Sequence, residues 1–224
     1  MPKILTVRLG VAKSFLIQGK EGYLLIDAGS GKKANKLWRF LKKHGIPPQD
    51  INLIVITHGH HDHIGSLAEI KEKTRALVII HEKDKDLLTG KLRPIRGMSR
   101  FADLIARNLS KMPVKPPSAG VEPDILITDD FSLEEYGFDA KILCTPGHTL
   151  GSVSVLLRTK ELFVGDFTMG LPMRLRPGLP FIFEDKELLI KSWKRIAKED
   201  FETIYQSHGR KFNKKRLDKV ASKL

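Results

Sequence analysis

The segment that most constrains this chain runs from Thr57 to Gly65, because it holds four His and one Asp within positions 58–63. It follows a continuous apolar run, Ile51–Ile56, which is typical of a strand buried on both faces. A helical pattern begins at Ser66, so the histidines are expected in a tight turn at the end of that strand. Four imidazoles would be costly to bury there without partners. A divalent metal ion removes that cost, because neutral imidazole is a preferred ligand of zinc and iron.

Composition places the chain among ordinary globular proteins. Of its 224 residues, 41% are hydrophobic and 29% are charged, which excludes a disordered chain, a collagen-like chain and a simple coiled coil. The sole cysteine, Cys144, excludes an internal disulfide framework. No linker or change of composition divides the sequence, so we expect a single domain over residues 1–224.

Short β-rich runs alternate with helical patterns along the chain. The runs predict strands over residues 4–9, 14–18, 23–26, 51–56, 77–80, 124–127, 141–143, 152–157, 162–164 and 203–206. Apolar residues at helical spacing predict helices over 33–43, 66–73 and 184–198, and the basic tail is expected to form another. Strands and helices mixed in one unit indicate an α+β or layered sandwich class.

The net charge of +13 is concentrated in two segments. Residues 83–115 carry nine Lys or Arg against three Asp, and residues 209–224 carry seven against one. Within residues 83–123 we expect a basic helical insert, which would either cover an active-site cleft or lie as a plain surface helix. Its apolar stripe consists of Phe101, Leu104, Ile105, Leu109 and Met112. The charge either attracts anions or forms a solvated face.

Three more potential metal ligands occur after predicted strands, each beside a glycine that lets the backbone turn. They are His148, Asp166 and His208. A lone His near a strand end is more often a hydrogen-bonded structural residue. The occurrence of all three in order behind the His-rich turn favours a shared metal site instead.

Together these residues resemble the metallo-β-lactamase fold superfamily of hydrolases. The leading motif of that family, His-x-His-x-Asp-His, is present from His58 to His63. Its later ligands match, in order, His148, Asp166 and His208. The segment Leu25–Gly29 is similar to the Asp-Gly turn of the family. The resemblance extends over about residues 14–209 and implies a four-layer αββα sandwich, with two metals in a cleft at one edge of the paired sheets.

The resemblance also implies the ligands of each metal. The first metal is expected on His58, His60 and His148. The second is expected on Asp62, His63 and His208, with Asp166 bridging the two. Asp62 is also the predicted catalytic residue, because it would hydrogen-bond the hydroxide between the metals, whereas Asp27 is expected to orient a ligand. The implied cofactors are two divalent metal ions, zinc first, with iron or manganese as alternatives.

The implied reaction is hydrolysis of an ester-like bond (thioester, lactone or phosphoester) by the metal-bridging hydroxide. We expect a small, anionic substrate, bound in part by Arg174 and Arg176 of the Pro- and Gly-rich loop 171–183. One alternative is an enzyme similar to persulfide dioxygenases, with a single iron on His60 or His58, His148 and Asp166. A second alternative is a nuclease that binds nucleic acid through the +13 charge, which the aromatic content of 7% and the lack of aromatic–basic interleaving disfavour.

The N-terminal region has no apolar block of signal-peptide length, and the longest unbroken apolar run, residues 76–80, is far shorter than the ~20 residues of a membrane helix. We therefore expect a cytoplasmic protein without a membrane partner. The oligomeric state is left open by the sequence.

Overall fold

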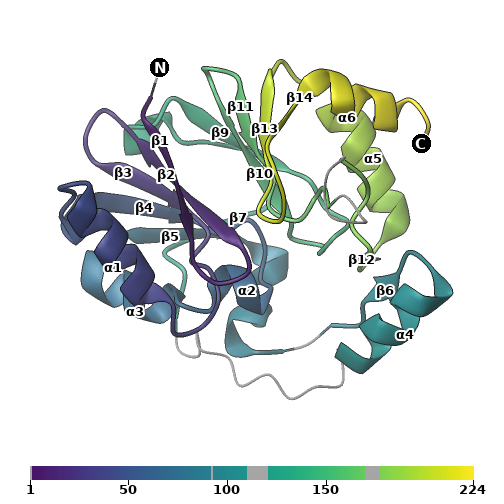
Figure 1. The fold of residues 1–224 in the computed structure, drawn as a ribbon, viewed down its shortest axis with the longest axis horizontal. Coiled ribbons are helices and arrows are strands. Elements are labelled where there is room, and N and C mark those ends of the chain that lie inside the picture. The colour runs from purple at the N-terminus through teal and green to yellow at the C-terminus, as the bar shows by residue number, and fades with distance from the viewer. Residues whose placement is uncertain (1, 92, 110–120, 170–176) are drawn as a thin grey trace.

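Six strands form the first of two sheets in the computed structural model, which describes residues 2–91, 93–109, 121–169 and 177–224. The strand order is β1-β2-β3-β4-β5-β7 (Figure 1). The strands are β1 (Ile4–Arg8), β2 (Lys13–Gln18), β3 (Tyr23–Ile26), β4 (Ile51–Val55), β5 (Leu77–His81) and β7 (Ile125–Ile127). The first three pair antiparallel, whereas β3, β4, β5 and β7 are parallel. The parallel strands therefore end at the same edge of the sheet.

The second sheet also has six strands, in the order β14-β13-β11-β10-β9-β8. They are β8 (Phe131–Ser132), β9 (Ala140–Cys144), β10 (Val153–Leu157), β11 (Glu161–Phe163), β13 (Thr203–Tyr205) and β14 (Phe212–Asn213). Only β11 and β13 are parallel, so their carboxyl ends also coincide. A separate ribbon pairs β6 (Arg96–Gly97) with β12 (Ile182–Phe183) and joins two segments that lie far apart in the sequence.

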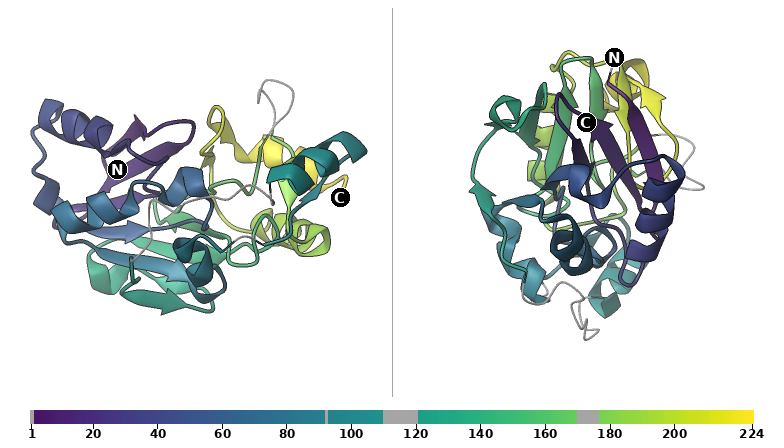
Figure 2. Two further views of the ribbon diagram at one scale, coloured as in Figure 1. Left: turned by 90° about the horizontal axis from the view of Figure 1, so that it is seen from below. Right: turned by 90° about the vertical axis from the view of Figure 1, so that its left-hand side faces the viewer.

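Helices cover the outer face of each sheet (Figures 1 and 2). On the first sheet these are α1 (Ala34–Lys43) and α3 (Leu67–Thr74), and on the second they are α5 (Lys186–Ile196) and α6 (Lys214–Ala221). Two further helices lie outside these layers, α2 (His61–Ile64) and α4 (Arg100–Leu109). Short 3-10 helices are η1 (Pro48–Asp50), η2 (Glu82–Thr89) and η3 (Glu134–Tyr136). Among the described helices, none is both long and apolar enough to cross a membrane.

Three apolar clusters fill the spaces between the layers. One joins α1 and α3 to the first sheet and includes Leu37 and Leu41. The central one lies between the two sheets, where the rings of Phe15 and Phe163 approach to 5.0 Å. The third packs α5 and α6 on the second sheet around Trp193. Three interfaces between four layers confirm the predicted αββα sandwich, in which each sheet buries both faces.

The predicted strands and long helices agree with the structure to within two residues at each end. The structure differs from the prediction at very short elements. The His-rich turn contains the helix α2, which begins at His61. The two-residue strands β6, β8, β12 and β14 were also not predicted, because two residues carry no detectable hydrophobic period.

The basic segment 83–123 is described in part, and its described elements are η2 from residue 83 onward, β6 and α4. The predicted helix is present as α4, but Leu104 of its expected apolar stripe is 60% exposed, while Ala102 and Ala106 are buried. Small side chains therefore face the ribbon of β6 and β12, which α4 contacts. Met112, Arg174 and Arg176 lie outside the described residues. That the segment covers a cleft, and that residues 1–224 form one domain, stay predictions.

Candidate metal centre

All seven residues predicted as ligands lie in one cluster, at the sheet edge where β4, β11 and β13 end. They form three overlapping groups, and within each group the ligand atoms lie within 4.8 Å of one another. The groups are His58, His60 and His148; His58, His63 and Asp166; and Asp62, His63 and His208. Because they follow strands of both sheets, the fold brings together residues that are up to 150 positions apart, from 58 to 208. Figure 1 shows the sheets approaching each other at this edge.

The first group consists of three imidazoles whose nitrogens point at one another. His60 Nδ1 lies 3.1 Å from His58 Nε2 and 3.0 Å from His148 Nε2. His148 Nδ1 lies 3.0 Å from the carbonyl oxygen of Ile182, so this nitrogen carries the proton and Nε2 has a free lone pair. His58 Nδ1 lies 3.2 Å from Thr57 Oγ1. Because the Thr57 hydroxyl donates its proton to Asp27, its oxygen accepts from His58 Nδ1, and Nε2 of His58 also has a free lone pair.

Two lone pairs, on His58 and His148, therefore face the single Nδ1 of His60. A neutral imidazole carries one N–H and can donate it to only one of them. The other contact then places two acceptors at hydrogen-bond distance in a buried site, which costs free energy. A cation bound by all three nitrogens removes this conflict, and three His are a donor set typical of catalytic zinc sites.

The group of Asp62, His63 and His208, which we call the second group from here on, places one carboxylate between two imidazoles. Asp62 Oδ2 lies 2.9 Å from His208 Nε2 and 3.8 Å from His63 Nε2. His63 Nδ1 donates to Asp27 Oδ2 at 2.7 Å, so Nε2 is the ring nitrogen that is turned into the cluster and that would offer its lone pair to a metal. The Asp62 side chain is 28% exposed, whereas those of His63 and His208 are buried. Asp62 therefore forms the side of the group that solvent can reach.

Asp166 lies between the two groups and turns one oxygen to each. Its Oδ1 lies 3.4 Å from His63 Nε2 and 3.3 Å from His208 Nε2. Its Oδ2 lies 3.7 Å from His148 Nε2, in the three-histidine group. Gly165, directly before it, has φ +52° and a Cβ there would lie 2.5 Å from Thr57 Oγ1, so glycine is needed where the chain turns toward the cluster.

Polar atoms without hydrogen-bond partners mark where cations fit in this cluster. Among the described residues, His63 Nε2 and Asp166 Oδ1 are buried and have no such partner, although they face each other. Buried polar atoms are otherwise almost always paired, and these two are of the kinds that ligate divalent metals. The side chains of this centre therefore fit one or two divalent cations.

Burial keeps the three-histidine group uncharged. It lowers the pKa of His58 well below the usual range for histidine, with His63 as the next cause. It lowers the pKa of His60 to about 4, and the pKa of His148 falls for the same reason. Near neutral pH these rings are therefore in the neutral form that binds a metal.

The carboxylates act in the opposite direction on the second group. Burial alone would disfavour a charged His63, but Asp27, Asp62 and Asp166 raise its pKa well above the usual range. Burial would likewise raise the pKa of Asp62, yet His63 and His208 lower it. Without a metal, a charged His63 therefore offsets part of the negative charge of the three carboxylates, and metal cations would take over that role.

Asp27, which is expected from the sequence to orient a ligand, contacts two residues of the His-rich turn. It is fully buried at the end of β3, in the left-handed region with φ 62° that Asp tolerates better than most residues. Its Oδ1 accepts the N–H of Thr57 at 2.8 Å, and the Thr57 hydroxyl donates to the same carboxylate at 2.9 Å. Its Oδ2 accepts from His63 Nδ1, so one carboxylate fixes both the start of the His-rich turn and one imidazole.

The remaining histidines and the cysteine lie outside the cluster. His61 is exposed at the first position of α2. His44 ends α1, and its Nδ1 lies 2.8 Å from the carbonyl oxygen of Phe40. His81 accepts from the Lys83 N–H and lies 3.2 Å from the oxygen of Thr128. Cys144 is half-buried.

The sequence did not point to Asp84, which is fully buried next to the centre. Its carboxylate accepts the N–H of Gly59, between His58 and His60, and bonds the segment that follows His148. Asp84 occurs in the charged run Glu82–Asp86, which is typical of a solvent-exposed turn. Its burial depends on partners that are 65 and 67 residues away, so no local signal identifies it.

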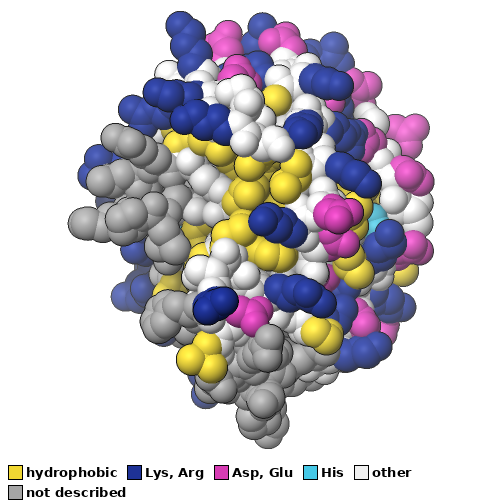
Figure 3. Space-filling model, turned by 90° about the vertical axis from the view of Figure 1, so that its right-hand side faces the viewer, with side chains coloured by type: hydrophobic (Ala, Val, Ile, Leu, Met, Phe, Trp, Pro, Cys, Tyr) yellow, Lys and Arg dark blue, Asp and Glu magenta, His cyan; other side chains and the backbone are white. Residues whose placement is uncertain are grey.

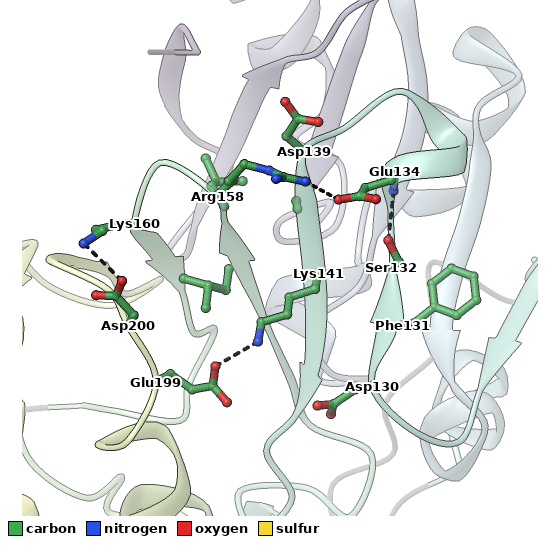
Figure 4. A pocket seen from close by; sticks show the side chains of 13 residues that line it. Asp130, Phe131, Ser132, Glu134, Asp139, Lys141, Arg158, Lys160, Glu199 and Asp200 are labelled. Atoms are coloured by element: carbon green, nitrogen blue, oxygen red, sulfur yellow. Dashed lines mark hydrogen bonds and ion pairs between the residues drawn. The ribbon is translucent and has the colours of Figure 1, made fainter.

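A cavity of about 470 Å³ lies on the second sheet, between β8, β9, β10 and the segment after α5 (Figure 4). None of the seven clustered residues lines it. Several of its charged side chains pair with one another, as in the contacts of Lys141 with Glu199 at 2.9 Å and of Lys160 with Asp200 at 3.1 Å. The lining therefore consists largely of ion pairs and contains none of the potential metal ligands.

Lys and Arg side chains are spread over the face formed by α5, α6 and the β6–β12 ribbon, with Asp and Glu between them (Figure 3). A band of apolar side chains crosses the same face. The described apolar residues at the margin of the third cluster include Met98, Leu179 and Leu224. On this face the positive charge is thus dispersed and does not form a separate stripe.

An αββα sandwich with a His- and Asp-rich cluster at the edge of its sheets defines a metal-dependent class of enzymes. The sequence profile of the metallo-beta-lactamase superfamily matches residues 7–208. The chain therefore belongs to the metallo-β-lactamase superfamily, and its enzyme class is that of the metallo-hydrolases.

Curated relatives and solved structures agree with this assignment. The probable metallo-hydrolase MJ0888 of Methanocaldococcus jannaschii is 28% identical over 88% of this chain and 87% of its own length. The probable metallo-hydrolase YqgX of Bacillus subtilis is 32% identical over 67% of this chain, and the match spans 62% of that protein. The structure of the B3 metallo-β-lactamase BLEG-1 has a TM-score of 0.71 at 22% identity and covers 98% of each chain, which shows the shared fold.

Proposed function

We propose that this chain is a binuclear metal-dependent hydrolase of an ester-like bond. The observation that carries the proposal is the position of Asp166, whose Oδ1 faces His63 and His208 while its Oδ2 faces His148. A carboxylate shared in this way suits two cations, because one anion between them reduces their repulsion. The first would be held by the three-histidine group and the second by Asp62, His63 and His208.

Divalent cations held there would polarise the oxygen of the scissile bond and lower the pKa of water, so that a strong nucleophile is available at neutral pH. The residues of the chain supply orientation and proton handling. The buried contacts of Asp27 and of the Ile182 carbonyl hold His63 and His148 with their Nε2 atoms turned inward. Asp62, the most exposed of the carboxylates in the centre, is the group that would hydrogen-bond the attacking water and orient it.

Thioesters are the first substrate class to test. The hydroxyacylglutathione hydrolase of Pelagibacter ubique is 29% identical to this chain over 69% of it, and the match covers 54% of that enzyme. Lactones and phosphoesters belong to the same proposal, because all present an oxygen that a metal polarises and a bond that water attacks. The net charge of +13 favours small anionic members of these classes.

The metal content decides between this proposal and its main alternative. Protein purified without added metal and without a metal-chelating tag should contain about two divalent ions per chain, with zinc expected to predominate. The structure of TTHA1623 in a di-iron-bound form, which is 25% identical with a TM-score of 0.70, makes two irons the next candidate. A single iron per chain, together with oxygen uptake on glutathione persulfide, would favour the dioxygenase alternative and contradict the proposal.

Turnover provides a second test. The double variant His60→Ala with Asp62→Ala should lose hydrolysis of every ester tested, because it removes one ligand from each group. His61→Ala is the matched control, since this neighbouring imidazole is exposed and lies outside the cluster. Retained hydrolysis in the double variant would refute the metal-dependent mechanism. Oligonucleotide binding that weakens steeply with rising salt would instead favour the alternative of a nuclease that binds nucleic acid.

A further inference from the structure

We infer that Asp84 is a positioning residue for the three-histidine group, and that it sets the metal affinity of that group without being a ligand. The inference rests on the proposed function, because it requires that the group bind a metal. Asp84 lies in η2, outside the motifs that carry the ligands, and its side chain is fully buried. It accepts main-chain N–H groups of two ligand turns, whereas Asp27 accepts from the main chain of one turn and from an imidazole.

The contacts of Asp84 join the two turns that carry this group. Its Oδ2 accepts the N–H of Gly59 at 2.9 Å and the hydroxyl of Thr149 at 2.7 Å. Gly59 stands between His58 and His60, and Thr149 directly follows His148. One oxygen atom therefore ties together the backbones on which all three imidazoles are mounted.

The other oxygen holds the same turn from a second side. Oδ1 accepts the N–H of Gly151 at 3.0 Å and a bond from the Arg93 guanidinium. A Cβ at Gly151 would lie 2.6 Å from this oxygen, so a glycine is needed for the carboxylate to approach the backbone. Arg93 in turn lies 3.1 Å from Glu184, whose carboxylate accepts the N–H of Leu150 at 2.7 Å. Arg93 thus balances the charge of a carboxylate that would otherwise be costly to bury.

The asparagine variant removes this arrangement with little change of shape. Each carboxylate oxygen of Asp84 accepts two donors, whereas an amide has a single acceptor oxygen. In Asp84→Asn the amide NH₂ must therefore face either the N–H of Gly59 or the N–H of Gly151 and the Arg93 guanidinium, and those groups, which can only donate, separate from it. The two turns are then no longer held at a fixed distance, and the ligand nitrogens of the three imidazoles no longer point at one shared position.

The experiment is a titration of metal-free protein with Co²⁺ alone, followed by its visible absorption and repeated with Zn²⁺ against a competing chelator. Asp84→Asn should weaken one of the two binding steps about tenfold or more, within the range of about 10–100-fold known for groups that support ligands. The other step should change less than about threefold. The weakened step should be the one lost in His148→Ala, which assigns it to the three-histidine group.

A milder pair of variants keeps the inference testable if Asp84→Asn does not fold. Thr149→Val removes one donor to Asp84 and should weaken the same step, and Thr149→Ser should restore it, because the serine hydroxyl can make the same bond. The control is Asp124→Asn. Asp124 accepts the N–H of Val78 at 2.7 Å at the amino end of β5, away from the cluster, so its loss should affect stability alone.

Three results would be decisive. Two unchanged binding steps in a folded Asp84→Asn variant would refute the positioning role. So would an equal weakening of both steps that follows the loss of folding free energy, measured by urea denaturation of the metal-free protein, since that is the effect of a merely structural residue. If the wild-type protein bound no metal, both the proposed function and the inference about Asp84 would fail. If the wild type and the Asp84→Asn variant bound metal equally well, only the inference about Asp84 would fail.

Discussion

Replacing Asp27 by Asn tests how far one buried carboxylate determines the state of a metal ligand. The carboxylate accepts the N–H of Thr57 on Oδ1 and the Nδ1–H of His63 on Oδ2. Asparagine has a single acceptor oxygen, so one of these two buried N–H groups must face the amide NH₂. A buried donor left without a partner costs about 1–3 kcal/mol, and we expect the metal-free protein to lose stability in that range.

The effect on metal binding follows from the tautomer of His63. If the amide oxygen turns to Thr57, then Nδ1 of His63 must become the acceptor, and the ring proton moves to Nε2. That nitrogen faces Asp166 at 3.4 Å and is the atom turned into the centre, so its lone pair is lost to a metal. A loss of about 10–100-fold in affinity is expected, which corresponds to about 1.4–2.7 kcal/mol. Backbone strain should contribute little, because Asn tolerates the φ of 62° found at this position.

Two measurements check this prediction. Urea denaturation of the metal-free protein gives the change in the free energy of unfolding, and competition with a chromophoric chelator gives the affinity for Zn²⁺. Asp124→Asn serves again as the control, because it replaces a carboxylate that accepts a strand N–H far from the centre. A variant that lost stability but bound Zn²⁺ as tightly as the wild type would show that Asp27 does not set the tautomer of His63.

Three further predictions concern packing, a ligand turn and a thiol. Trp193→Ala should destabilise the protein by about 3–5 kcal/mol in urea denaturation, because the ring is fully buried and stacks on Phe167 at 5.3 Å. Gly147→Ala should cost more than about 1 kcal/mol by the same measurement and weaken Zn²⁺ binding, since φ is +137° and the new Cβ would lie 2.4 Å from the backbone of Leu189. Burial and a nearby carboxylate raise the pKa of Cys144 to about 11, so less thiolate is present at pH 8. Its labelling by iodoacetamide should then be on the order of 100-fold slower at pH 8 than in the unfolded chain, and should rise about tenfold per pH unit up to about pH 11. Equal rates in the two states would contradict that pKa.

The main strands and helices could be predicted because each produces a pattern of apolar residues over several consecutive positions. The buried strand Ile51–Val55 is recognisable as a continuous apolar run, and α5 as a helix with one apolar side. The seven clustered residues could be predicted for a different reason. All seven follow strands, His148, Asp166 and His208 each stand beside a glycine that allows a turn, and the parallel neighbours β11 and β13 bring Asp166 and His208 to the same edge.

The parts that escaped prediction depend on contacts between distant segments. The ribbon of β6 and β12 consists of two pairs of residues, Arg96 with Phe183 and Gly97 with Ile182, too few for any periodic pattern. Yet the carbonyl of Ile182 in this ribbon orients His148. A hydrogen-bond partner on the main chain leaves no trace in residue type, so this contact could be found only in the structure.

Asp27 and Asp84 show why motif reading identifies ligands more readily than the groups that hold them. A metal demands particular side-chain atoms, and the choice of His or Asp at fixed spacing records that demand in the sequence. A positioning carboxylate needs only donors within reach, and Asp84 takes two of its four from backbone N–H groups that every residue except proline possesses. The size limits at its two glycine partners come from Leu87 at Gly59 and from Asp84 itself at Gly151, and in the sequence such glycines look the same as those of an ordinary turn. The two carboxylates also act on different degrees of freedom, since Asp27 fixes a proton on an imidazole and Asp84 fixes the distance between two turns. A centre of this kind requires both, because a ring with the correct tautomer binds poorly if its backbone is displaced, and a well-placed ring does not bind if its lone pair is protonated.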